Sequence, residues 1–107
     1  MKLVLAVIHD EDSAKLSHAL SNNGFQTTKL ASTGGFLKQG NTTMMVGVPK
    51  EKVDEVIDII KEECTTRKQL TLDHHSGLPS GRVPYPVEVV VGGATVFVLD
   101  VDQFLKI

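Results

Sequence analysis

The residues best suited to bind an anion and an aromatic base lie in one glycine-rich segment, residues 33–43, which reads TGGFLKQGNTT. Its glycines let backbone N–H groups approach and cradle an anion, and Phe36 offers a ring on which a base can stack. Asn41 carries an amide that can pair with an adenine edge, while Lys29 and Lys38 are cations able to meet phosphates. A plain glycine turn whose Phe36 packs on a neighbour explains the same residues, so the composition leaves both interpretations open. The segment is not a P-loop, because no Gly-Lys-Ser/Thr follows and a strand comes where a helix is required.

Two adjacent histidines, His74 and His75, follow Asp73 and suggest a metal site at first sight. Neighbouring side chains of a strand point to opposite faces, and no further His or Cys lies at ligand spacing. We therefore predict no metal site and no cofactor, and we expect these residues in a solvated loop. His9 and His18 are isolated in the sequence, and we expect them at the surface or at a contact between subunits.

No arrangement of nucleophile and general base is visible. Ser32, Ser76 and Ser80 lack the strand-to-helix elbow of a serine nucleophile, and the carboxylates are scattered over predicted helix surfaces. Cys64 completes an apolar helical stripe, which predicts a core residue. The sequence therefore predicts a ligand-binding regulator and not an enzyme.

Length and composition set the frame for this site. The 107 residues fit one domain, and 41% hydrophobic with 22% charged residues is close to the globular average. A formal net charge of −2 gives no reason to expect nucleic acid or a membrane as partner. No apolar run approaches the roughly 20 residues of a membrane span, and no signal peptide is visible at Met1. With a single cysteine, the chain is expected to be cytoplasmic.

The first part of the chain reads as a strand, a helix and a strand. Residues 2–8 form an almost unbroken apolar run that predicts a buried strand. A helix is predicted from about Glu11 to Asn22, with Asp10 as its N-cap and acidic residues in its first turn. Asn23-Gly24 predicts its end, and Phe25 to Ala31 a second strand.

The same pattern follows about forty residues later. Asn41 to Val48 is strand-like, and Pro49 stands where a helix begins. The helix carries an apolar stripe at helical spacing, formed by Val53, Val56, Ile57, Ile60 and Cys64. Two strand–helix–strand units predict an α+β, ferredoxin-like fold, with a four-stranded antiparallel sheet and both helices on one face. The sheet face without helices would need other subunits to cover it, which favours a closed oligomer.

The last third is less regular. Arg67 to Asp73 suits a short strand, and His74 to Pro86 is rich in proline, glycine and serine, which predicts a long loop. Val87 to Val91 and Ala94 to Asp100 are β-rich runs. Because Gly92-Gly93 separates them, we predict a hairpin.

Two long motifs resemble the PII-like cyclic di-AMP receptor family of Gram-positive bacteria. TKLASTGGFLKQGNTT, residues 28–43, is similar to the family's loop motif, and YPVEVVVGGATVFV, residues 85–98, to its terminal strands. The resemblance implies a single PII-like domain over residues 1–107, assembled as a homotrimer that binds cyclic di-AMP in clefts between subunits. It further implies loops that respond to occupancy and a downstream protein that the sequence does not identify. The ligand-binding residues that it implies are Gln26, Thr28, Gly35, Phe36, Leu37, Asn41, Gly47 and Phe97.

The chain departs from the family pattern at several positions. Position 26, usually arginine, is Gln26 here, so a cation that would meet a phosphate is absent. A charge-assisted contact contributes ~1.5–3 kcal/mol, so the affinity is expected to fall about ten- to hundred-fold. Residues 105–107 read LKI where the family has His-Gln-Phe, and Asp100 stands where proline is usual. Two alternatives stay open: binding of another adenine nucleotide such as ATP, and an interaction trimer without a ligand.

Overall fold

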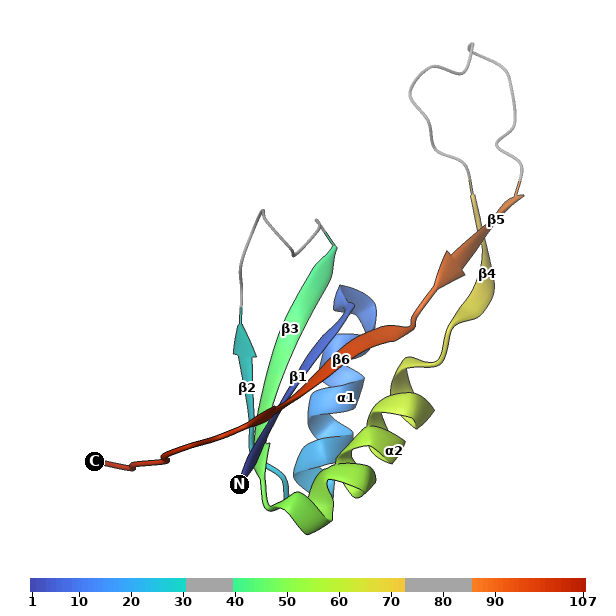
Figure 1. The fold of residues 1–107 in the computed structure, drawn as a ribbon. Coiled ribbons are helices and arrows are strands. Elements are labelled where there is room, and N and C mark those ends of the chain that lie inside the picture. The colour runs from blue at the N-terminus through green and yellow to red at the C-terminus, as the bar shows by residue number, and fades with distance from the viewer. Residues whose placement is uncertain (31–39, 73–85) are drawn as a thin grey trace.

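The computed structural model describes residues 1–30, 40–72 and 86–107, and it has an α+β fold (Figure 1). Four of the strands form one antiparallel sheet, and two others form a separate ladder. The elements run in the order β1 Lys2–His9, α1 Asp10–Asn22, β2 Thr27–Leu30, β3 Asn41–Val48, a 3-10 turn Lys50–Lys52, α2 Val53–Cys64, β4 Arg67–Leu72, β5 Pro86–Val91 and β6 Ala94–Asp100.

The main sheet has the strand order β2-β3-β1-β6, with every neighbouring pair antiparallel. Strand β1 pairs with β3 along its whole length, from Lys2 opposite Val48 to His9 opposite Asn41. On its other side β1 pairs with β6. The first strands of the two predicted units, β1 and β3, lie side by side in the middle of the sheet, and its fourth strand is β6, while β4 lies outside it. The predicted ferredoxin-like arrangement of four antiparallel strands and two helices is confirmed, with β6 in the place of the second unit's last strand.

Both helices pack on the same face of the sheet. Along β1 and β3 every second side chain is buried, as expected of strands with one covered face. The core combines buried side chains of both central strands and both helices: Val4, Ala6, Ile8, Leu16, Leu20, Met44, Val46, Val48, Val56, Ile60 and Cys64. Of the predicted stripe on α2, Val56, Ile60 and Cys64 are buried, while Val53 and Ile57 are half-buried at its sides.

The first helix begins one residue earlier than predicted, at Asp10, and its N-cap is His9. The prediction of Asp10 as the N-cap is therefore wrong. Its side chain accepts a hydrogen bond from Thr42 Oγ1 on β3 and does not cap the helix. The end of the helix at Asn22 is as predicted, and Gly24 adopts a φ of +84°, which glycine tolerates best.

Strand β2 is shorter than the predicted strand, residues 25–31. Phe25 belongs to the turn after α1, because its backbone N–H donates to Leu20 O at 2.9 Å. Ala31 lies outside the described residues. In the described parts of the chain, no helix is both long and apolar enough to cross a membrane.

The predicted hairpin at Gly92-Gly93 is wrong. Strand β5 pairs with β4, whereas β6 pairs with β1 in the main sheet. Figure 1 shows β5 and β6 following one another along nearly the same line, so the chain does not reverse between them. Both glycines have positive φ, +84° and +88°, and they bend the chain from one ladder into the other. The glycine pair therefore serves a crossing between the two ladders and not a tight turn.

Strands β4 and β5 together form an arm that projects from the body, while the segment after β6 extends to the opposite side (Figure 1). The two strands pair from Arg67 opposite Val91 to Leu72 opposite Pro86. We call them the β4–β5 arm. The predicted loop between them, residues 74–86, lies outside the described residues apart from Pro86, and His74 and His75 lie outside them as well.

Candidate functional site

One face of the sheet carries no helix, and we call it the open face. Its side chains alternate with the buried core residues along β1 and β3. Because paired residues of neighbouring strands share a face, the strand register assigns its members. They are Leu3, Leu5, Val7 and His9 of β1, Asn41, Thr43, Met45 and Gly47 of β3, Thr28 and Leu30 of β2, and Thr95, Phe97 and Leu99 of β6. Every predicted ligand residue on a described strand therefore lies on this face.

A hollow of about 380 Å³ opens on this face, and we call it the Gln26 hollow. Three predicted ligand residues, Gln26, Thr28 and Gly47, line it. The remaining lining is apolar and consists of Met1, Leu3, Met45, Val101 and Phe104. Pockets for small ligands span about 300–1,000 Å³ and combine apolar walls with a few polar groups. The hollow has this character and lies at the lower end of the size range.

Gly47 is exposed within this hollow, and a Cβ built on it meets no atom within 4 Å. Its backbone φ lies outside the left-handed region, so any residue can adopt it. A single copy of the chain therefore does not require glycine at this position. Glycine inside a strand often marks a place where a ligand or another chain approaches closely.

Asn41 lies at the other end of β3, in a polar hollow of about 190 Å³ that we call the Asn41 hollow. It is opposite His9 on β1, and Gly92 and Gly93 are among the other residues that line the hollow. The distance along the strand from Asn41 to Gly47 is roughly 20 Å, at 3.3–3.4 Å per residue. Among the described residues of one chain, the predicted ligand residues therefore do not line one pocket: Gln26, Thr28 and Gly47 lie at one end of β3 and Asn41 at the other.

Phe97 lies between these groups on β6, opposite Leu5, and is 42% exposed. Gly35, Phe36 and Leu37 lie outside the described residues, so their predicted roles stay predictions.

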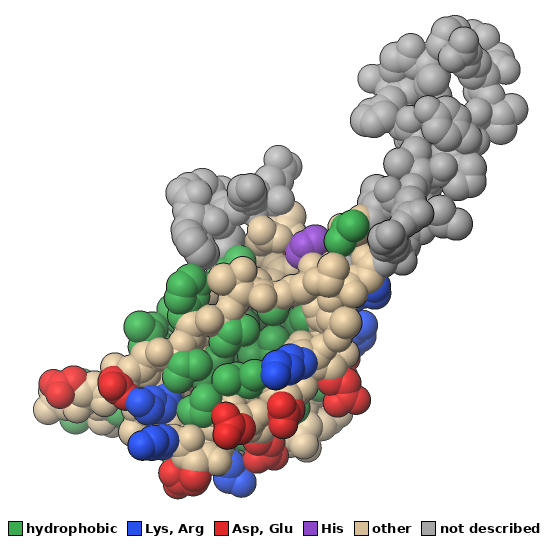
Figure 2. All heavy atoms as spheres, turned by 45° about the vertical axis from the view of Figure 1, so that its right-hand side comes forward, with side chains coloured by type: hydrophobic (Ala, Val, Ile, Leu, Met, Phe, Trp, Pro, Cys, Tyr) green, Lys and Arg blue, Asp and Glu red, His purple; other side chains and the backbone are tan. Residues whose placement is uncertain are grey.

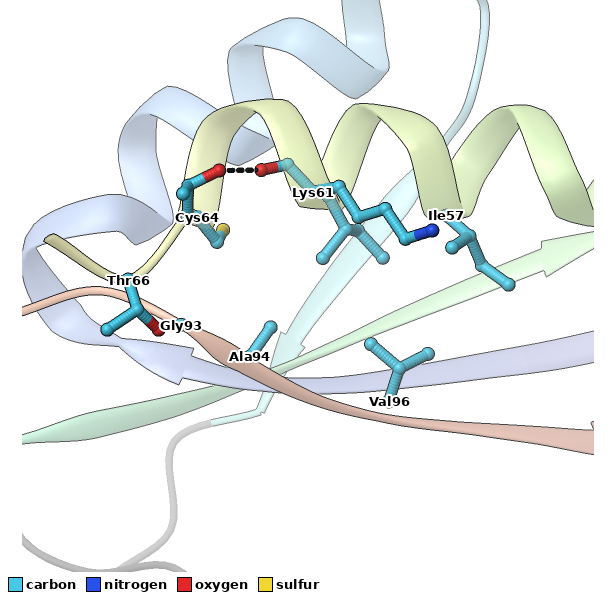
Figure 3. Close-up of a pocket in the computed structure, with 9 residues that line it drawn as sticks. Ile57, Lys61, Cys64, Thr66, Gly93, Ala94 and Val96 are labelled. Atoms are coloured by element: carbon cyan, nitrogen blue, oxygen red, sulfur yellow. Dashed lines mark hydrogen bonds between the residues drawn. The ribbon is translucent and has the colours of Figure 1, made fainter.

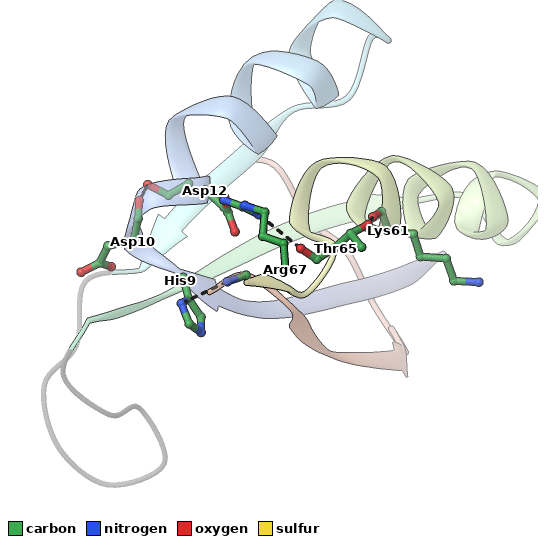
Figure 4. A network of polar contacts seen from close by, with 8 residues as sticks. His9, Asp10, Asp12, Lys61, Thr65 and Arg67 are labelled. Carbon is green, nitrogen blue, oxygen red and sulfur yellow. Dashed lines mark hydrogen bonds and ion pairs between the residues drawn. The ribbon is translucent and has the colours of Figure 1, made fainter. Parts of the chain in front are cut away.

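The Asn41 hollow borders a network of polar contacts that joins β1, α1 and the base of the β4–β5 arm (Figure 4). The Gly92 N–H donates to His9 Nδ1 at 3.4 Å, so His9 is half-buried and bonded, not isolated. Asp12 is fully buried, and its Oδ1 accepts a hydrogen bond from Arg67 Nη2 at 2.8 Å. This hydrogen bond raises the pKa of the Arg67 guanidinium, which holds its positive charge beside the buried carboxylate.

A larger hollow of about 560 Å³ lies between α2 and β6, on the helix side of the sheet (Figure 3). Its walls are mainly apolar, with Ile57, Ile60 and Val96 among them. Figure 2 shows hydrophobic side chains gathered in the centre of this side of the molecule, with charged side chains around them. Cys64 lines the hollow, and burial raises the pKa of its thiol to about 11, so it is a neutral core residue as predicted. None of the predicted ligand residues that the structure describes lines this hollow.

Two features were not found from the sequence. Val101 and Phe104, of the segment after β6, line the Gln26 hollow, and no local sequence pattern predicts this placement. Asp12 is one of the acidic residues of the predicted first helix turn, and the carboxylates as a group are predicted on helix surfaces, yet Asp12 is buried. A signal for this was present, since Asp12, Leu16 and Leu20 follow one another at a spacing of four and therefore share a helix face.

These observations define a small α+β domain whose glycine and amide positions gather on an uncovered sheet face. The whole chain, residues 1–107, matches the family described as cyclic-di-AMP receptor. The chain therefore belongs to the cyclic-di-AMP receptor family, as its two long motifs predicted. It is also similar to a crystal structure of a functionally unknown protein from Pediococcus pentosaceus ATCC 25745, with 44% sequence identity and a TM-score of 0.78. That match covers 99% of this chain and 96% of the other and supports the fold.

Proposed function

We propose that this chain forms a homotrimer that binds cyclic di-AMP in clefts between subunits and relays occupancy to a protein partner. The observation that carries the proposal is the separation of the two groups of candidate ligand residues. Gln26, Thr28 and Gly47 line one hollow, while Asn41 lies roughly 20 Å from Gly47 along β3. A cleft that joins the Gln26 hollow of one copy to the Asn41 end of the next brings both groups to one ligand.

The uncovered sheet face supports the assembly. Leu30, Phe97 and Leu99 are 39%, 42% and 45% exposed on it, although all three are large apolar side chains. An apolar surface that spans several strands of a single chain is typical of an interface. A ring of three copies joined by the same head-to-tail contact covers the open face of each copy and closes on itself.

The lining of the Gln26 hollow favours a dinucleotide of low charge. No Lys or Arg is among the described residues that line it. Neutral hydrogen bonds, such as those of Gln26 and Thr28, stabilise a phosphate less than charge-assisted ones do. Cyclic di-AMP carries two separated single charges, whereas ATP concentrates its negative charge on one triphosphate. The absence of a cation at this hollow therefore weakens ATP binding more than cyclic di-AMP binding.

The function that we propose is binding without chemistry. We treat residues 1–107 as one PII-like domain, and we assign no residue a catalytic role. The apolar side chains of the Gln26 hollow exclude water around a base, and Gly47 allows the ligand to approach the backbone of β3.

Thermal-shift titrations with cyclic di-AMP, ATP and cyclic di-GMP, combined with sedimentation velocity, test this proposal. We expect a species of three times the 11.6 kDa chain mass and stabilisation at the lowest concentration by cyclic di-AMP. Gln26→Arg is expected to tighten that binding about ten- to hundred-fold, because it adds a charge-assisted contact. If ATP stabilises the protein at a lower concentration than cyclic di-AMP does, the chain is an ATP receptor. A trimer that no nucleotide stabilises would identify an interaction protein instead.

A further inference from the structure

Two carboxylates in the first turn of α1 bind two different parts of the chain. Asp10 binds the start of β3: its backbone N–H donates to Gly40 O at 2.8 Å, and its carboxylate accepts a hydrogen bond from Thr42 Oγ1. Gly40 and Thr42 are the two sequence neighbours of Asn41. Asp10 therefore fixes the backbone on both sides of the residue that defines the Asn41 hollow.

Asp12, two residues later, binds the base of the β4–β5 arm. It pairs with Arg67, the first residue of β4, at 2.8 Å, and Figure 4 shows the two side chains reaching toward each other from α1 and β4. The same guanidinium donates through Nη1 to Thr65 O at 3.2 Å. Just after the returning strand β5, Gly93 donates its N–H to Cys64 O at the end of α2. Both strands of the arm are thus attached to the body at one place.

The burial of Asp12 makes this attachment a strong constraint. Its side chain is 1% exposed, whereas that of Arg67 is 39% exposed. Its second oxygen, Oδ2, has no hydrogen-bond partner among the described residues. A buried carboxylate is costly unless a cation compensates it, so a displacement of Arg67 leaves a charge without compensation. The arm base and the helix turn must therefore move together.

We infer that the first turn of α1 couples the Asn41 end of the ligand site to the β4–β5 arm, with Asp12 and Arg67 as positioning residues. A shift of Gly40 or Thr42 displaces Asp10, and the hydrogen-bonded helix turn passes the displacement to Asp12 and its partner. The ligand's role in this relay rests on the proposed function. The coupling itself is a property of the ligand-free chain, so it is testable without any ligand.

Amide hydrogen exchange of the ligand-free full-length chain tests the coupling in both directions. Thr42→Val removes the hydrogen bond to Asp10 and keeps the side-chain shape. We expect it to speed exchange at least about threefold in β4, a strand with which Thr42 forms no hydrogen bond or strand pair among the described residues. Arg67→Met is expected to speed exchange in the same proportion at the first residues of β3. Glu55→Gln, which removes the exposed pair of Lys52 and Glu55, is the matched control and leaves both regions unchanged.

Two results would overturn the coupling. One is faster exchange confined to the immediate neighbours of each substitution. The other is an equal increase in every peptide, α2 included, because that means general destabilisation. If Arg67→Met does not fold, Asp12→Asn, which keeps the shape and removes the charge, gives the same comparison.

Exchange in the presence of cyclic di-AMP separates the coupling from the proposed function. With ligand, the wild-type chain is expected to gain protection both at the start of β3 and in β4. Arg67→Met is expected to keep the gain in protection at the start of β3 and to lose the gain in β4. A purely structural role of Arg67 does not produce this difference between the two strands. If the wild-type chain gains no protection anywhere, the proposed function fails while the ligand-free comparison still decides the coupling. Equal gains in β4 for wild type and Arg67→Met would refute the positioning role.

Discussion

Substitution of Gly47 by alanine tests whether glycine is needed at this position for the fold of one copy of the chain, or for its assembly or ligand binding. A Cβ at position 47 meets nothing within 4 Å, and the backbone there is ordinary for a strand. Replacing glycine by alanine within a strand stabilises by about 0.5–1 kcal/mol. For a domain of this size that raises the melting temperature of the ligand-free protein by about 3 °C. In a filled cleft the same methyl group is overpacked, at a cost of about 1–3 kcal/mol.

The assay is a melting curve of ligand-free Gly47→Ala, its sedimentation velocity and a calorimetric titration with cyclic di-AMP. We expect an unchanged or slightly higher melting temperature together with about tenfold or greater loss of affinity. A loss of the trimer at unchanged stability locates the close approach at the subunit contact instead of the ligand. Wild-type affinity and wild-type assembly would refute the reasoning, because nothing would then approach Gly47. A marked fall in melting temperature would refute the claim of open space in the single copy.

Three further substitutions or reactions test the described contacts. Burial raises the pKa of the Cys64 thiol from 9.0 to about 11. At pH 8 a disulfide reagent should therefore label this thiol about 100-fold more slowly in the folded protein than in urea-unfolded protein. Equal labelling rates would show that the thiol is accessible. Gly92→Ala should lower the unfolding free energy, measured by urea titration, by about 3 kcal/mol. The reason is that φ at this position is +84° and the added Cβ would lie 2.5 Å from Thr65 O. An unchanged unfolding free energy would contradict the backbone geometry between β5 and β6. The hydrogen bond from Lys2 lowers the pKa of Asp100, so the stabilisation by this pair is present above the ordinary pKa and is lost as the pH falls through the lowered one. Asp100→Asn should therefore lower the melting temperature at pH 7 and have no effect at the acid end of a pH series; a difference that persists in acid would contradict the pairing.

The parts of the fold that the sequence predicts best are those set by local pattern. The apolar alternation of β3 predicts its bounds, Asn41–Val48, as the structure has them. The apolar stripe on α2 predicts which face of the helix is buried. At the periodicity of a helix, Val56, Ile60 and Cys64 lie on one side, so only that side can face the core. The helix end at Asn23-Gly24 follows from backbone preference alone.

The errors occur where a local pattern has more than one tertiary use. A Gly-Gly pair provides two residues of positive φ, which suit either a two-residue turn or a crossing between ladders. The choice depends on which strand each neighbour pairs with, and that is a long-range property. In the same way an acidic residue in a first helix turn suits the helix dipole whether or not it is buried. The partner that allows Asp12 to be buried, Arg67, lies far away in the sequence.

For the candidate site, the sequence names a set of residues but not their arrangement. The resemblance implied Gln26, Thr28, Asn41, Gly47 and Phe97 as neighbours of one ligand. The structure distributes them along the open face of a single chain, with Asn41 and Gly47 at opposite ends of one strand. In the proposed assembly the contacts that join the two groups lie between copies, and a single sequence carries no pattern for such contacts.

The most direct test of the central claim is a calorimetric titration of the purified chain with cyclic di-AMP. We expect saturable binding with one ligand for each chain and three ligands for each trimer. If the wild-type chain does not bind but the Gln26→Arg variant does, the loss of affinity is due to position 26, and the proposed binding site still holds. Absence of binding in both proteins would contradict the receptor function for this chain while leaving its fold and its family unchanged.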